Sequence, residues 1–125
     1  MGSEPLKDPE NAHAIPESWR RVLGRIVEAF TQGDYALSTP LAFVAPLSPS
    51  TAEQIREYIA DYGETLIDLP DETWHTSVCQ WMETHWDLLV DLWTAESGRS
   101  DLVLAVRVFE GDGDYRFEID SVHVP

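Results

Sequence analysis

The feature that most constrains the fold is the recurrence of apolar residues at every second position through the C-terminal third of the chain. Successive side chains of a β-strand point to opposite faces, so this pattern predicts strands at residues 86–94, 101–110 and 114–123. Glycine-containing interruptions at residues 95–100 and 111–113 predict the turns between them. The end of the chain is therefore expected to form an antiparallel β-meander.

Two amphipathic helices are expected ahead of this sheet. Apolar residues recur at helical spacing from residue 16 to residue 31, and Gly33 ends the pattern. A second helix is expected to begin at Ser50, whose side chain can form a capping box with Glu53, and to end at Gly63. The expected fold is α+β, with two N-terminal helices packed on one face of a curved antiparallel sheet.

The remaining segments complete the expected organisation. Residues 1–14 are polar and contain prolines, which predicts a flexible tail, and residues 15–125 are expected to form a single α+β domain. Residues 71–84 fit both a helix face and a strand, and a short turn followed by a strand is favoured.

The chain carries a formal net charge of −15, and the acidic excess is concentrated after residue 60. Residues 61–125 contain fifteen acidic and three basic side chains, a local net charge of −12. Such a field repels nucleic acids and anionic membranes, so neither is an expected partner. It attracts a basic protein partner and speeds the encounter, although acidic residues also promote solubility alone.

Cysteine usage and motif content limit the chemistry. A single cysteine, Cys79, excludes an intramolecular disulfide and fits a reducing, cytoplasmic location, and no apolar run reaches the length of a membrane span. His75 and Cys79 stand four residues apart, but zinc usually needs three or four ligands, so no metal is expected. The sequence has no nucleotide-binding or nucleophile motif, so no catalytic residue, no cofactor and no enzymatic activity are expected.

The candidate contact region surrounds the turn expected after residue 94. Its members are Asp87, Asp91, Trp93, Glu96, Arg99 and Asp101. Within it, the segment Gly98–Asp101 has two interpretations. In the first it is a structural turn, in which Arg99 pairs with Asp101 or Glu96 and the Ser100 hydroxyl bonds to the turn backbone. In the second it is a recognition loop.

Two stretches of the chain resemble known families. Residues 91–102, DLWTAESGRSDL, and residues 119–125, IDSVHVP, resemble an uncharacterised bacterial domain family with an LWT-x-E-x-GRSDL core, which implies no known activity. More loosely, residues 26–35, IVEAFTQGDY, resemble the first helix of the NTF2-like superfamily. That resemblance implies helices against a curved antiparallel sheet around a conical pocket. The superfamily includes enzymes, binding proteins and immunity proteins, so it implies no single function.

Three functions are consistent with these observations. The preferred one is an acidic cytosolic protein-binding module, of immunity or antitoxin type, that engages a basic partner through the contact region. The alternative is a small-molecule pocket between helices and sheet, for ligand binding or catalysis, with Trp19, Tyr35, Trp74 and Trp86 as walls. The third is a domain that forms a homodimer through its sheet. Trp93 has the opposite strand parity from Trp86, so it is either an interface anchor or covered by residues 1–14.

Overall fold

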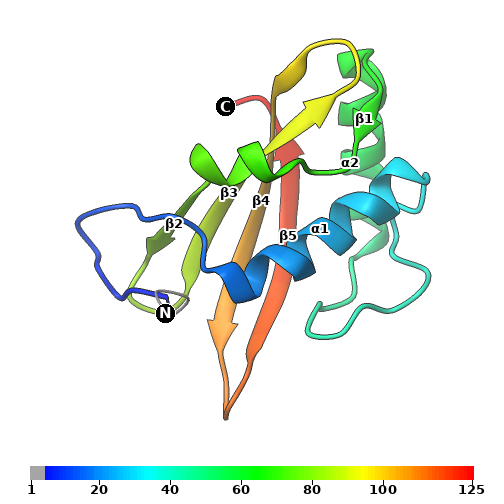
Figure 1. The fold of residues 1–125 in the computed structure, drawn as a ribbon. Coiled ribbons are helices and arrows are strands. Elements are labelled where there is room, and N and C mark those ends of the chain that lie inside the picture. Colours follow the sequence, from blue (N-terminus) through cyan, green and yellow to red (C-terminus); the bar gives the residue numbers. More distant parts are fainter. Residues whose placement is uncertain (1–4) are drawn as a thin grey trace.

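The computed structural model describes residues 5–125 and has two helices followed by a curled antiparallel sheet (Figure 1). The elements are α1 (Glu17–Thr31), α2 (Pro49–Tyr62), β1 (Leu66–Ile67), the 3-10 helix η1 (Asp71–His75), β2 (Val78–Trp81), β3 (Trp86–Thr94), β4 (Gly98–Glu110) and β5 (Tyr115–His123). Strands β3, β4 and β5 are consecutive and antiparallel, which confirms the expected meander. Strands β1 and β2 both pair with β3, so the sheet has five strands. The expected α+β fold is confirmed.

Helix α1 crosses one face of the sheet, which we call the inner face, and supplies much of the core (Figure 1). Its buried side chains recur at helical spacing, as the sequence predicts: Trp19, Leu23, Ile26, Val27 and Phe30. The Trp19 ring packs edge-on against Trp86 of β3, with ring centroids 5.4 Å apart. Large aromatic rings therefore join the helix to the centre of the sheet.

Helix α2 packs beside β5 but begins differently from the prediction. Its N-cap is Ser48, whose side chain accepts a hydrogen bond from the Thr51 N–H at 3.1 Å, so the capping box expected from Ser50 is wrong. The reason is Pro49, which occupies the first helical position, where a proline has no N–H to lose. Gln54 then donates to the Val122 carbonyl at 2.9 Å and ties the helix to β5.

The side chains of β3 alternate between the two faces of the sheet along the whole strand. Its alternate residues Trp86, Leu88, Val90 and Leu92 are fully buried on the inner face. The residues between them, Asp87, Leu89, Asp91 and Trp93, point to the other side, which we call the outer face. The parity expected for Trp86 and Trp93 is therefore correct.

Short extended segments cover parts of both sheet edges. On β2, His13 exchanges two backbone hydrogen bonds with Cys79, at 2.8 and 2.7 Å. On β5, Val44 forms a parallel bridge with Phe117. Such cover limits edge-to-edge pairing with other chains. The bridge at His13 also places the end of the expected flexible tail against the sheet.

The segment between β1 and β2 forms a short 3-10 turn followed by a strand, in agreement with the interpretation favoured for residues 71–84. Side-chain hydroxyls replace the missing backbone partners of β3 at this gap. Thr73 donates to the Asp91 carbonyl at 2.6 Å, and the Asp91 N–H donates to Ser77 at 2.9 Å. Both hydroxyl residues are buried, so the gap is closed by specific polar contacts.

Candidate functional site

Five of the six predicted contact residues lie on the outer face of the sheet or beside it. Asp87, Asp91 and Trp93 come from β3, and Arg99 and Asp101 come from the first residues of β4. Trp93 and Arg99 are direct cross-strand partners. The structure thus brings these side chains to the side of the sheet opposite α1.

The segment Gly98–Asp101 is not a turn, which corrects that prediction. The turn consists of residues 95–97, and β4 already begins at Gly98. Gly98 has a φ of 72°, a left-handed conformation that glycine adopts without strain, and the Trp93 ring lies over it. A Cβ at this position would meet the Trp93 ring at 3.7 Å, an ordinary van der Waals contact, so the backbone conformation and not the space favours glycine here.

Ser100 and Arg99 have different roles within this segment. The Ser100 hydroxyl is buried, donates to the Leu92 carbonyl at 2.8 Å and accepts from the Leu102 N–H at 3.1 Å. It thereby fills an irregularity in the β3–β4 register. Arg99 is exposed, and within residues 5–125 it forms no ion pair with Asp101 or Glu96. Ser100 is therefore structural, whereas Arg99 is available to a partner.

Glu96, the sixth predicted residue, is held away from the outer face. Its carboxylate accepts hydrogen bonds from the Thr65 N–H at 2.7 Å and the Thr65 hydroxyl at 2.8 Å, and these bonds lower the pKa of Glu96. The neighbouring Glu64 accepts from Thr94 at 2.7 Å and from Ser97 at 2.9 Å. Glu96 therefore fastens the β3–β4 turn to the start of β1.

Polar side chains border a shallow hollow on the outer face. His85 lies 3.0 Å from Asp87, and Arg107 lies 3.9 Å from Asp87 and 4.0 Å from Asp120. The hollow has a volume of about 150 Å³, and Leu89, which is 40% exposed, contributes to its lining. The site prediction missed Leu89, Arg107 and Asp120. The alternation on β3 and β4 already placed the first two on this face, and the β-bulge in the β4–β5 pairing hid the third.

The charge of residues 61–125 is divided between this face and the loops. Strand alternation and the contacts above place five carboxylates and three arginines on or beside the outer face: Asp87, Asp91, Asp101, Glu118, Asp120, Arg99, Arg107 and Arg116. The other ten acidic residues of this half lie in loops or near the ends of elements, and one of them, Glu110, pairs with Lys7 of the N-terminal segment. The outer face is thus mixed in charge, and the acidic excess surrounds it.

His75 and Cys79, the pair four residues apart, lie in different environments. His75 is exposed in η1, whereas the Cys79 side chain is buried, and burial raises the pKa of its thiol to about 12. The thiol is therefore protonated and unreactive at neutral pH. Within residues 5–125, no three His, Cys, Asp or Glu side chains are grouped to hold a metal ion.

The aromatic residues proposed as pocket walls do not line one cavity. Trp19 and Trp86 are buried against each other, and Tyr35 stacks on Phe30 with ring centroids 5.8 Å apart. Trp74 lies elsewhere, beside Arg20, whose guanidinium carbon is 5.5 Å from the Trp74 ring centroid. The tryptophans and Tyr35 thus fill or flank the core at separate places.

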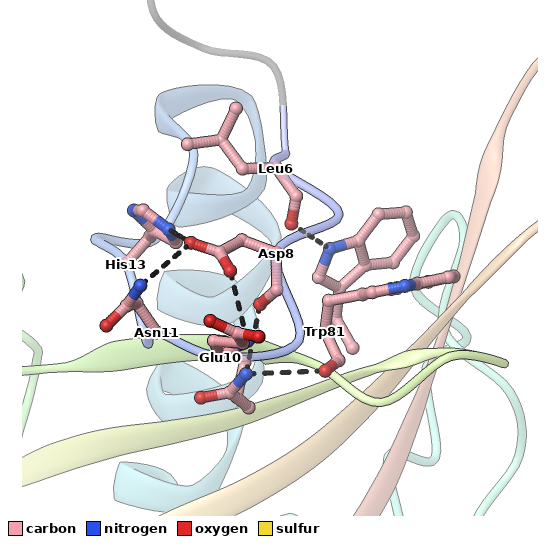
Figure 2. Close-up of polar contacts among 8 residues, drawn as sticks. Leu6, Asp8, Glu10, Asn11, His13 and Trp81 are labelled. Atoms are coloured by element: carbon pink, nitrogen blue, oxygen red, sulfur yellow. Dashed lines mark hydrogen bonds and ion pairs between the residues drawn. The ribbon is translucent and has the colours of Figure 1, made fainter.

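A second polar cluster lies at the N-terminal segment (Figure 2). Figure 2 shows Asp8 at its centre: the carboxylate accepts from the Glu10 N–H at 3.0 Å and from the Asn11 amide at 3.3 Å, and His13 lies 2.9 Å away. The hydrogen bond with His13, followed by those from Glu10 and Asn11, lowers the pKa of Asp8 to about 2. Residues 8–13 are thus folded into a local loop, a feature that the sequence pattern does not predict.

Together these features define a small α+β domain with a mixed-charge open sheet face, an acidic periphery and an ordered N-terminal loop. The chain belongs to a family of domains of unknown function, DUF7668, whose family model matches residues 27–125. This agrees with the resemblance to an uncharacterised family. No curated protein and no solved structure matches the chain. In the described part, no helix is both long and apolar enough to cross a membrane.

Proposed function

We propose that this protein is a protein-binding module that docks a basic partner on the outer face of its sheet. The observation that carries the proposal is the exposed Leu89 in a hollow bordered by the charged side chains of Asp87, Arg107 and Asp120. A central apolar contact surrounded by polar groups is the usual anatomy of a protein interface. Arg99, which is exposed and has no ion pair within residues 5–125, extends this surface along β4.

The preference for a basic partner rests on the charge around the face. The ten acidic residues in loops and at element ends create a negative field that attracts a basic protein before contact. The three arginines on the face then favour a partner that carries some carboxylates among its basic residues. A cytoplasmic immunity or antitoxin protein is the narrower form of this proposal.

The test compares two exposed apolar residues, one in the hollow and one in the turn between β2 and β3. Leu89→Arg places a charge in the hollow, whereas Met82→Arg changes a residue that is 45% exposed in the β2–β3 turn. Each variant and the wild type is used to capture partners from the native cells, and captured proteins are identified by mass spectrometry. A basic protein recovered by wild type and Met82→Arg, but lost with Leu89→Arg, supports the proposal.

Other outcomes of the capture decide against it. A partner retained equally by both variants rejects the outer face as the docking surface. Recovery of the same chain alone, with light scattering that shows a dimer in wild type and a monomer in Leu89→Arg, indicates homodimerisation in place of a basic partner.

Association kinetics test the role of the periphery. Asp112 and Glu83 lie in turns at one end of the sheet, so their replacement by Asn and Gln leaves the face intact. Exposed charges act over about 8 Å at physiological ionic strength, so the double variant should associate more slowly at low salt and dissociate at the wild-type rate. An association rate insensitive to salt and to this change would limit the negative charge to a role in solubility.

A further inference from the structure

The only lysine of the chain, Lys7, lies over a pair of tryptophan rings at the edge of the sheet. Its ammonium nitrogen is 5.3 Å from the ring centroid of Trp81 and 5.9 Å from that of Trp86. The same nitrogen is 2.8 Å from Oε1 of Glu110. Two indole faces and one carboxylate thus surround one cation, and we call Trp81, Trp86 and Glu110 the indole site.

The chemistry of the indole site suits an ammonium ion. The face of an indole ring carries partial negative charge and attracts cations within about 6 Å, and Glu110 adds a full opposite charge. The ring centroids of Trp81 and Trp86 are 4.5 Å apart, and the angle between the ring planes is 53°. Trp86 also packs in the core against Trp19. A neutral alkyl chain of the same size would gain only the apolar contact with the rings.

The segment that carries Lys7 is attached largely through other residues. Gln80 donates to the Asp8 carbonyl at 3.1 Å, Trp86 donates to the Leu6 carbonyl at 3.1 Å, and His13 pairs with Cys79. The Lys7 side chain itself is 52% exposed. Residues 6–8 are thus held through side-chain contacts and form no strand pairing, and such a segment opens at lower free energy than the sheet that it covers.

The indole site and Lys7 also differ in whether the family model covers them. Trp81, Trp86 and Glu110 lie within the region that the family model matches, residues 27–125, whereas Lys7 precedes it. The indole site therefore belongs to the family domain of this chain, and Lys7 is supplied by a segment outside the matched region.

We propose that the indole site binds alkylammonium ligands, and that Lys7 is an intramolecular ligand that competes for it. When residues 6–8 leave, the rings and Glu110 take a cation from another source, either a lysine side chain of a protein or a free small amine. The site lies on the inner side of the sheet, opposite the outer face. Its test is therefore independent of the docking proposal, and failure at one surface leaves the other unaffected.

The experiment uses the full chain with Lys7→Ala, which empties the site, and Lys7→Met, which keeps it filled with an uncharged side chain. Each protein is titrated with n-butylammonium chloride, the analogue of the lysine side chain, and with n-butanol as a neutral ligand of matched length. Binding is followed by the NMR signals of the Trp81 and Trp86 indole N–H groups. Unchanged signals of the remaining residues verify that the variants are folded.

The expected result is saturable binding of n-butylammonium to Lys7→Ala, much weaker binding to wild type, and intermediate binding to Lys7→Met, whose uncharged side chain keeps only the apolar contact with the rings. If Lys7 fills the site in nine molecules of ten, the apparent Kd of wild type rises by about tenfold over that of Lys7→Ala. Adding Glu110→Gln to Lys7→Ala should weaken the binding further. Equal binding of n-butanol and n-butylammonium, or no change in either indole signal of folded Lys7→Ala, overturns the proposal.

Two further ligands identify the source of the cation. A capped tripeptide with a central lysine and flanking alanines represents a protein side chain, and methylammonium represents a free small amine. Tighter binding of the tripeptide to Lys7→Ala assigns the site to a protein ligand. Tighter binding of methylammonium assigns it to small amines.

Discussion

The two faces of β3 carry neighbouring residues of similar chemistry in opposite environments. Leu88 is fully buried on the inner face, whereas the adjacent Leu89 is 40% exposed on the outer face. On the inner face each side chain contacts the helices or the aromatic core, so its identity is explained by packing. On the outer face the same type of residue has no such explanation. This difference separates the residues that stabilise the fold from those that we assign to the proposed docking surface.

The sharpest test of this comparison replaces each leucine by alanine. Leu88→Ala leaves a cavity in a packed core and should lower the free energy of unfolding by about 2–5 kcal/mol. Leu89→Ala removes a side chain from a surface hollow and should change it by about 0.5 kcal/mol or less. Urea denaturation of the two variants gives both values. A similar loss in both variants would mean that the outer face is covered in solution.

The next test asks which residues of the segment Gly98–Asp101 stabilise the fold and which are available for binding. Ser100→Ala leaves the Leu92 carbonyl and the Leu102 N–H without their hydroxyl partner, so the free energy of unfolding should fall by about 1–3 kcal/mol. Arg99→Ala should change it by about 0.5 kcal/mol or less, because the side chain is exposed. Thermal unfolding and partner binding are measured for both. Stability lost in Arg99→Ala with unchanged binding would contradict this division.

The fold was predictable where a pattern repeats. Strand β3 spans the expected residues 86–94, because alternation over a whole strand leaves only one register that buries the apolar set. The start of β4 was placed three residues late, at Asp101. Gly98 suggests a turn in the sequence, and Ser100, which lies at the irregular pairing with β3, is a polar residue in a buried position, so the apolar alternation does not extend to it. Gly98 therefore marks an irregular region of the β3–β4 pairing, but the turn predicted there is wrong.

The candidate sites were less predictable, for a different reason. Parity placed Asp87, Asp91 and Trp93 on one face, but it could not show that Glu96 turns towards Thr65, thirty-one residues away in sequence. The position of Lys7 over Trp81 depends on contacts across most of the chain, and a single lysine in a polar segment carries no periodic signal. Side-chain contacts between distant segments depend on the folded structure, so the spacing of residues along the sequence does not predict them.

The smallest expected effect concerns Glu96, an acid that belongs to the structural side of the comparison although it lies in an exposed turn. Its hydrogen bonds from Thr65 hold its pKa below the ordinary value of 4.5. Because folding lowers this pKa, the stabilisation is fully present above pH 4.5 and is lost as the pH falls through the folded-state value.

Replacing this carboxylate should therefore change the acid side of the stability profile. Glu96→Gln should lower the melting temperature slightly at pH 7, and its difference from wild type should shrink as the pH falls from about 6 to about 3. Thr65→Ala, which removes the hydroxyl donor but keeps the backbone N–H, should produce part of the same change. Melting temperatures measured across this range for the three proteins test both statements. A difference between wild type and Glu96→Gln that stays constant with pH would show that the ionised carboxylate is not what fastens the turn, and Glu96 would then return to the group of residues available to a partner.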